Sequence, residues 1–262
     1  MKNKVLHYCW FGGAPFPEIV KKCMESWKQF CPDYEIIEWN ESNFDIHCCK
    51  YVEQAYEAKK WAFVSDYCRF FVLYNYGGIY LDTDVELIKP IDDLPQNFVG
   101  FENKSTIASG LIRGALIRDT VCKLMLESYR NDKFILSKGK QNLETVCERE
   151  TAILSKYGLK LDGTMQCVLN TYVYPTEYFC PINPLTFKKE ITPNTISIHH
   201  YSATWCSEED KKYFEIRAKY MENHSRKVAS FMAYYKIYRE KISPINALFK
   251  TIKVALKSLR KN

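Results

Sequence analysis

The sequence of 262 residues predicts an α/β fold with a mostly parallel sheet flanked by helices. The apolar run KVLHYCWF at 4–11 is typical of a buried strand. Residues 18–30 carry apolar side chains at helical spacing and predict an amphipathic helix. YEIIEW at 34–39 has the composition of a second strand. Strand, helix and strand in this order form a βαβ unit, whose two strands run parallel.

Further elements follow along the chain. Residues 50–76 have a helical pattern that Gly77 and Gly78 end, because glycine readily adopts the left-handed conformation of a C-cap. GIYLDTDVELI at 78–88 predicts another strand. Short strands, two amphipathic helices and a last region of strands and loops are then expected at 95–118, 119–131, 143–157 and 172–201. No repeat or linker interrupts the chain, so we expect one domain over 1–243 and a separate tail over 244–262.

Composition and charge exclude several classes of protein. Hydrophobic residues make up 47% and aromatic residues 15% of the chain, which is typical of a globular protein. No stretch approaches the roughly 20 apolar residues of a membrane span, and His7 interrupts the first apolar run too early for a secretory signal. We therefore expect a cytoplasmic protein. Most of the net charge of +6 lies in 236–262, so the nearly neutral body argues against nucleic-acid binding.

The eleven cysteines indicate reduced thiols. Their number is odd, most lie in apolar runs, and no C-x-x-C pair occurs, so a disulfide framework is not expected. Metal binding by His47, Cys48 and Cys49 is the alternative, but adjacent cysteines rarely share one tetrahedral site.

Asp82 and Asp84 are the first candidate site. On a strand, residues two apart point to the same face, and ligands of parallel sheets bind beyond the carboxyl ends of strands. Oxygen ligands suit Mn²⁺ or Mg²⁺, so the pair predicts a metal site; a solvated turn is the alternative. An EF-hand loop is excluded, because Leu87 and Asp93 stand where glycine and glutamate are needed. A phosphatase with an aspartyl nucleophile stays open.

Asp66 and Arg69 form the second candidate site. They are three residues apart, so they are neighbours on one helix face. A surface ion pair is the simple interpretation, but the surrounding helix is crowded with aromatic residues and leaves only a narrow polar face. At the edge of a pocket, such a pair can bind sugar hydroxyl groups.

SDYCRFFVLYNYGGIYLDTD resembles the sugar-binding region of glycosyltransferase family 32, and more distantly that of the clostridial toxin glucosyltransferases. HYCWFGG and IHHYSATW match the opening strand and the closing motif of that group, so the resemblance spans 5–205. It implies a GT-A type fold, a nucleotide-sugar donor with UDP favoured, Mn²⁺ or Mg²⁺, and retention of the anomeric configuration.

The resemblance also implies residue roles. Asp82 and Asp84 would hold the metal on the donor diphosphate, while Asp66 and Arg69 would bind the donor sugar. Trp10 would stack on the base, and Tyr80 would line the donor pocket. Ser202 and Trp205 would contact the β-phosphate.

One of two adjacent histidines would complete the metal site. Strand alternation lets only one of His199 and His200 face it, and the motif match favours His200. Ala203-Thr204 stands where many family members have Gly-Ser, which is a departure from the pattern.

The tail predicts a basic amphipathic helix. Its apolar stripe is Ile245, Leu248, Phe249, Ile252, Leu256 and Leu259, with lysines mostly off the stripe. Helices of this kind bind anionic membrane surfaces, whereas docking on the body or on a partner chain is the alternative. We expect a peripheral enzyme on the inner face of the cell membrane that builds a surface polysaccharide from a glycan or lipid-linked acceptor. A metal phosphohydrolase and a non-catalytic glycan-binding or membrane-binding module are the rivals.

Overall fold

The computed structural model describes residues 3–183, 185–202 and 208–259. The chain forms two compact units, of which the first comprises Met1–Ile182 and Glu190–Ser202. The second comprises Asn183–Lys189 and Ala203–Asn262. The expected boundary at 243/244 falls inside this second unit, so the extent of the catalytic domain stays a prediction.

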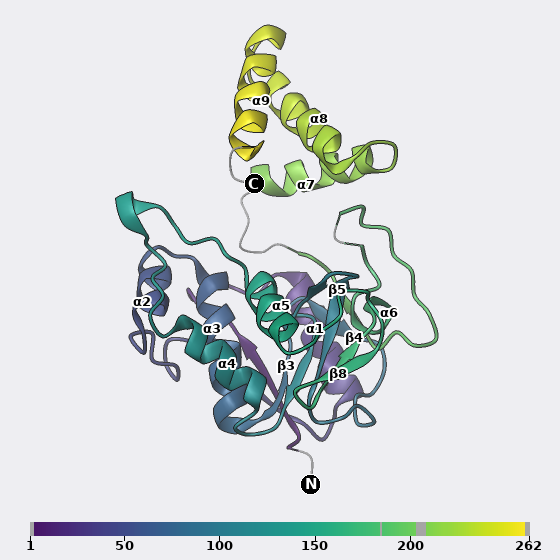
Figure 1. Cartoon of the computed structure of the whole chain (residues 1–262). Coiled ribbons are helices and arrows are strands. Elements are labelled where there is room, and N and C mark those ends of the chain that lie inside the picture. Colours follow the sequence, from purple (N-terminus) through teal and green to yellow (C-terminus); the bar gives the residue numbers. More distant parts are fainter. Residues whose placement is uncertain (1–2, 184, 203–207, 260–262) are drawn as a thin grey trace. The chain divides into compact units, whose positions relative to one another are not determined.

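The first unit is built on one mixed sheet (Figure 1). Its strand order is β2-β1-β3-β7-β5-β9-β8, with β6 paired to β5. Strands β2, β1, β3, β5 and β9 run in one direction, whereas β7 and β8 run antiparallel to their neighbours. The strands are β1 (Val5–Cys9), β2 (Glu35–Trp39), β3 (Gly78–Tyr80), β5 (Phe98–Asn103), β6 (Thr106–Ile107), β7 (Arg113–Ala115), β8 (Gln166–Val168) and β9 (Thr171–Tyr174). The predicted α/β fold with a mostly parallel sheet is confirmed.

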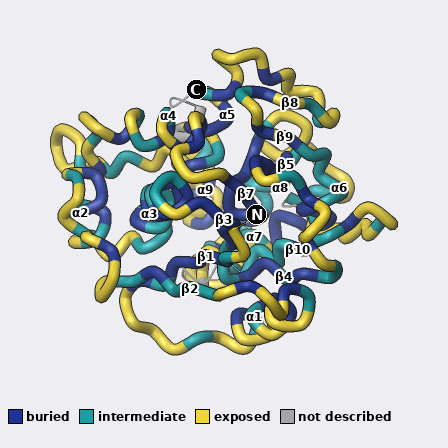
Figure 2. Tube along the Cα trace, turned by 90° about the horizontal axis from the view of Figure 1, so that it is seen from below, coloured by how far each residue is buried: buried dark blue, intermediate teal, exposed yellow. Residues whose placement is uncertain are grey.

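Helices pack against both faces of this sheet, and the strands between them are largely buried (Figure 2). Alternate strand residues enter different cores, since Leu6 packs with helix α1 whereas Cys9 packs with helix α3. The helices of this unit are α1 (Glu18–Phe30), α2 (Lys50–Glu57), α3 (Trp61–Tyr76), α4 (Thr120–Tyr129), the 3₁₀ turn η1 (Ser137–Gly139), α5 (Val146–Lys156) and α6 (Thr176–Phe179). As predicted, α3 ends at Gly77, whose φ of 64° is in the left-handed region.

The prediction of a single strand over 78–88 is wrong. The chain leaves the main sheet after Leu81, turns at Thr83 and Asp84, and continues as β4 (Val85–Leu87). Strand β4 pairs with β10 (Ser197–His199) in a separate antiparallel sheet of two strands. The two aspartates therefore lie at a junction between two sheets and not on one strand.

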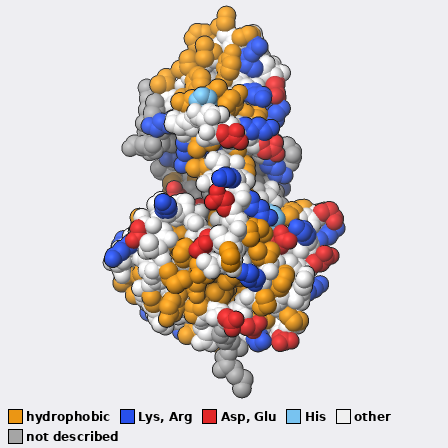
Figure 3. Space-filling view, turned by 90° about the vertical axis from the view of Figure 1, so that its right-hand side faces the viewer, with side chains coloured by type: hydrophobic (Ala, Val, Ile, Leu, Met, Phe, Trp, Pro, Cys, Tyr) orange, Lys and Arg blue, Asp and Glu red, His pale blue; other side chains and the backbone are white. Residues whose placement is uncertain are grey.

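The second unit contains α7 (Glu208–Met221), α8 (Arg226–Arg239) and α9 (Pro244–Leu259). Helix α9 begins where the basic amphipathic helix was expected. Its buried side chains are small, since Ala247 and Thr251 are fully buried, and Lys250 Nζ lies 4.3 Å from the ring centroid of Tyr238 on α8. Hydrophobic and basic side chains gather side by side on this helical unit (Figure 3). Among the described residues, no helix is long and apolar enough to cross a membrane.

Trp27 connects α1 to the strand that follows the aspartates. Its ring is fully buried, and its Nε1 donates a hydrogen bond of 2.7 Å to the carbonyl of Val85. Trp27→Ala should lower the free energy of unfolding by about 3–5 kcal/mol, because it leaves a cavity and an unpaired carbonyl. Urea denaturation followed by circular dichroism measures this, with Tyr157→Ala, at a half-exposed side chain, as the control. A loss of less than about 1 kcal/mol would contradict this packing role.

Candidate active site

Arg69 joins two carboxylates from different elements. Its Nη2 lies 2.9 Å from Oδ1 of Asp66, one turn earlier on α3, and 3.2 Å from Oδ1 of Asp82 beyond β3. Tyr80 lies beneath this group: its hydroxyl donates to Oδ1 of Asp82 at 3.0 Å, and its ring centroid is 4.9 Å from the guanidinium. Burial raises the pKa of Asp66 to about 6, against the opposing charge of Arg69.

Gly110 closes the other side of Asp82. Its carbonyl accepts a hydrogen bond of 2.9 Å from the amide of Asp82. A Cβ at position 110 would lie 2.0 Å from Oδ2 of Asp82 and 3.0 Å from Nη1 of Arg69. Because Arg69 and Tyr80 already fix this carboxylate, only glycine fits here.

Asp84 has a different set of partners. Its Oδ1 lies 3.1 Å from Nε2 of His199, and its Oδ2 accepts hydrogen bonds of 2.8 Å from both the amide and the hydroxyl of Ser202. Burial by itself disfavours the charge on Asp84, yet His199 and Ser202 hold the pKa of this carboxyl well below its usual range. Burial likewise opposes protonation of His199, but the charge of Asp84 raises the pKa of the imidazole to about 9.

His200, the residue favoured by the motif match, does not face Asp84 through its side chain. Its Nε2 lies 2.7 Å from Oε2 of Glu86, whose other oxygen is 3.0 Å from Nζ of Lys22. The alternation along β10 explains this, since His199 is the member of the pair that faces Asp84. Which of the two binds a metal stays a prediction.

The donors around Asp84 suit a divalent cation in part. A carboxylate, a hydroxyl and an imidazole meet there, and Mn²⁺ accepts all three once the imidazole has released its proton. Asp82, by contrast, is engaged by Arg69 and Tyr80. Within 3–183, 185–202 and 208–259, no group of three or more His, Cys, Asp or Glu side chains forms a ready metal site.

The remaining predicted residues are less tightly connected. Trp10 donates from Nε1 to the carbonyl of Ala14 at 2.7 Å, and its ring centroid lies 4.9 Å from that of Phe16. Tyr80 is only 1% exposed, so it supports Asp82 from beneath. Trp205 lies outside the described residues.

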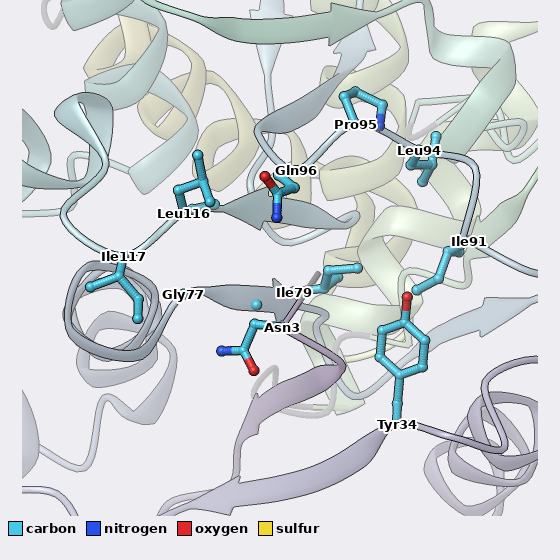
Figure 4. A pocket seen from close by; sticks show the side chains of 12 residues that line it. Asn3, Tyr34, Gly77, Ile79, Ile91, Leu94, Pro95, Gln96, Leu116 and Ile117 are labelled. Atoms are coloured by element: carbon cyan, nitrogen blue, oxygen red, sulfur yellow. The ribbon is translucent and has the colours of Figure 1, made fainter. Parts of the chain in front are cut away.

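A cavity of about 290 Å³ lies elsewhere on the first unit (Figure 4). Its lining includes Gly78 and Ile79 of β3, together with Leu116 and Ile117 after β7. This is the amino end of β3, opposite to the end that leads to Asp82. The lining is mainly apolar and contains none of the carboxylates described above.

Several contacts of the site had not been predicted. Gly110 lies in the region expected to hold only short strands and loops, and no spacing rule distinguishes it there. His199 had been considered, and the choice between it and His200 depended on the register of β10. Strand alternation limits the choice to one residue but does not say which.

Comparison with known proteins agrees with this geometry. The family model described as "Glycosyltransferase sugar-binding region containing DXD motif" matches residues 17–99, which include Asp66, Arg69, Asp82 and Asp84. The resemblance to a glycosyltransferase sugar-binding region is thus confirmed for residues 17–99, and the family of the whole chain stays a prediction.

One curated relative is inositol phosphoceramide mannosyltransferase 3 of Schizosaccharomyces pombe, with 29% identity over 99 residues. The match covers 35% of this chain and 26% of the relative, so the chain spans about a quarter of that protein.

Two solved structures are similar to this chain at lower sequence identity. PaToxG glycosyltransferase has a TM-score of 0.44 at 17% identity, covering 61% of this chain and 73% of that one. A glycosyltransferase involved in glycosylation of the major capsid of PBCV-1 has a TM-score of 0.40 at 12% identity, covering 87% and 98%. Scores below 0.5 do not establish a common fold, so the fold described above rests on the chain's own topology.

The pair formed by His199 and Asp84 should make stability depend on pH. The folded pKa of His199, about 9, exceeds its ordinary value of 6.5, so its contribution is complete below pH 6.5 and is lost as pH rises through 9. Without added metal, the free energy of unfolding should fall between those values with a slope approaching about 1.4 kcal/mol per pH unit. Urea denaturation across pH 6–10 measures it. The slope should disappear in His199→Gln and persist in His47→Gln, an exposed histidine; parallel curves for wild type and His199→Gln would contradict the pairing.

Proposed function

We propose that this chain is a metal-dependent, retaining glycosyltransferase. It moves a sugar from a nucleotide-sugar, a UDP-sugar being favoured, to a glycan or lipid-linked acceptor. The observation that carries the proposal is the contact of Arg69 with Asp66 and Asp82 inside a segment that matches a glycosyltransferase sugar-binding region.

The side chains of this contact suit a sugar. Asp66 and Asp82 accept hydrogen bonds from hydroxyl groups, and Arg69 donates them. Burial strengthens such hydrogen bonds and limits competition from water. In this assignment Trp10 stacks on the base, Tyr80 fixes Asp82 and Arg69 at the donor pocket, and Ser202 and Trp205 reach the β-phosphate.

Mn²⁺ or Mg²⁺ is the proposed cofactor, with Asp84, Asp82 and one of His199 and His200 as protein ligands. When bound, the ion neutralises charge that grows on the departing diphosphate. Asp84 is already ionised, since the pKa of its carboxyl is held low, so it needs no deprotonation before binding a cation. Ser202 orients Asp84 through two hydrogen bonds.

The reaction proposed for this site is front-face substitution. The acceptor oxygen bonds to the anomeric carbon on the side from which the diphosphate departs, and the acceptor's proton passes to a phosphate oxygen. Arg69 and Asp66 hold the sugar ring during this exchange, which keeps the anomeric carbon close to the acceptor oxygen and to the diphosphate.

The name of the S. pombe relative states that it transfers mannose to inositol phosphoceramide, which is a lipid. This supports a lipid-linked acceptor for the present chain. Synthesis of a surface polysaccharide is the process we propose.

Incubation with UDP-, GDP- and other nucleotide-sugars plus Mn²⁺ tests the activity, with transfer and donor hydrolysis as readouts. Asp84→Asn should reduce turnover by at least about a hundredfold, because it removes a charge aimed at the diphosphate site. The matched control Asp93→Asn, at an exposed carboxylate, should leave turnover unchanged. If no donor is turned over, or if phosphate is released from simple phosphoesters without any nucleotide-sugar, the proposal is wrong.

We further propose that α9 attaches the enzyme to the inner face of the cell membrane. Ile245 and Phe249 are 67% and 68% exposed, and Leu248, Ile252 and Leu256 are also exposed. The buried side chains of α9, Ala247 and Thr251, are small, so its large apolar side chains remain exposed and able to enter a lipid surface. Lysines beside them attract anionic headgroups.

Sedimentation with liposomes tests this attachment. The full chain should bind vesicles that contain phosphatidylserine and bind weakly to vesicles of phosphatidylcholine alone. Phe249→Ser should weaken binding by about tenfold or more, since burial of a Phe side chain contributes about 1.5–3 kcal/mol. Ile117→Ser removes an exposed apolar residue from the first unit and should have no effect. Equal binding by the two variants would argue for docking of α9 on a protein.

A further inference from the structure

Glu102 lies at the same sheet edge as the proposed donor site. It belongs to the end of β5, which runs in the same direction as β3. The hairpin between β5 and β7 bridges the two strands: Ala108 donates to the carbonyl of Gly100, and the carbonyl of Gly110 accepts from Asp82. Glu102 is two residues beyond Gly100, at a register shift of β5 between Phe101 and Asn103. It is therefore a third carboxylate at the edge that carries Asp82 and Asp84.

The carboxylate of Glu102 has few protein partners. Its Oε1 accepts a hydrogen bond of 3.3 Å from the hydroxyl of Tyr201, which also lies 2.9 Å from Sγ of Cys180. Among residues 3–183, 185–202 and 208–259, no lysine or arginine forms an ion pair with it. The side chain is half-buried, and burial raises the pKa of Glu102 although His199 and Tyr201 oppose the shift. A half-buried carboxylate that no lysine or arginine neutralises is a candidate for a role in binding.

Tyr201 connects Glu102 to the groups around Asp84. The ring centroid of Tyr201 lies 4.2 Å from that of His199, whose Nε2 is 3.1 Å from Oδ1 of Asp84. After the larger effect of burial, the charges of Glu102 and Asp66 both raise the pKa of the Cys147 thiol in the first turn of α5. Glu102 therefore lies close to the residues that hold Asp84.

The hydrogen bond to Tyr201 suggests a second, purely structural role for Glu102. Tyr201 has a φ of 50°, in the left-handed region, which is strained for a side chain of this size. The turn that contains it carries His199 and Ser202 to Asp84. Glu102 could therefore act only by fixing Tyr201. The two roles differ in what removal of each hydrogen-bonding group does to sugar binding.

We propose that Glu102 is a sugar-binding residue, whose carboxylate accepts a hydrogen bond from a hydroxyl group of the donor's sugar. The inference rests on the proposed function, since it needs a nucleotide-sugar in this site. It adds a carboxylate from β5 to the one that Asp66 provides from α3, so the hydroxyl groups of the sugar are recognised by groups from two elements. A site that hydrogen-bonds a particular hydroxyl discriminates strongly against sugars in which that group is missing or inverted.

The test compares the affinities of Glu102→Gln for a nucleotide-sugar and for the same nucleotide without its sugar, by calorimetry with Mn²⁺. The probe is the donor that the wild-type chain hydrolyses fastest. Glu102→Gln should weaken the nucleotide-sugar by about ten- to a hundredfold and leave the free nucleotide unchanged, because a hydrogen bond to a charged group is lost. The control Glu25→Gln, at an exposed position of α1, should change neither affinity. The melting temperature of Glu102→Gln should be equal to or above that of the wild type.

Three results would overturn the inference. The affinity for the nucleotide-sugar could stay unchanged, both affinities could fall equally, or Tyr201→Phe could reproduce the whole loss and reduce Glu102 to a support for Tyr201. A lowered melting temperature would likewise indicate a structural residue. If the wild-type chain binds no nucleotide-sugar at all, the proposed function fails and this inference fails with it. If the wild-type chain binds a nucleotide-sugar and Glu102→Gln binds it equally well, this inference is wrong but the proposed function stands.

Discussion

The contact of Arg69 with Asp66 and Asp82 is the constraint on which the rest of the site depends. A guanidinium with 5% of its side chain exposed needs carboxylates close by, because an unpaired buried charge is strongly destabilising. One carboxylate comes from the same helix and the other from beyond β3, so the pair fixes α3 against the end of that strand. Tyr80 and the hairpin at Gly110 then pack around a group that is already immobile.

The two aspartates of the D-x-D motif belong to different halves of the architecture. Asp82 is fixed by the main sheet and α3, whereas Asp84 is fixed by the small sheet through His199 and the turn to Ser202. Their electrostatic surroundings differ accordingly. Asp82 lies beside the permanent charge of Arg69, whereas Asp84 lies beside the titratable imidazole of His199. Asp82 is therefore held by a partner of fixed charge, whereas the partner of Asp84 can lose its charge.

The sequence was sufficient to predict what depends on local pattern. The βαβ start, the end of α3 at Gly77 and the neighbouring positions of Asp66 and Arg69 follow from short-range periodicity and glycine conformation. The break at Thr83 and Asp84 does not, because β4 pairs with β10 more than a hundred residues later, and an apolar run does not state its partner. The same distant pairing sets the register of β10, which places His199 and not His200 beside Asp84. Gly110 reaches Asp82 through a hairpin whose position only the assembled sheet determines.

The bare Cα of Gly110 has a consequence for the proposed donor site. Any side chain at 110 would collide with Asp82, so this side of Asp82 is closed to variation. In an enzyme of the proposed kind, new sugar preferences, whether selected in evolution or in the laboratory, must therefore arise at other positions. Residues around Asp66 and at the end of β5 provide that freedom, and saturation libraries aimed there would leave the approach of Gly110 to Asp82 intact.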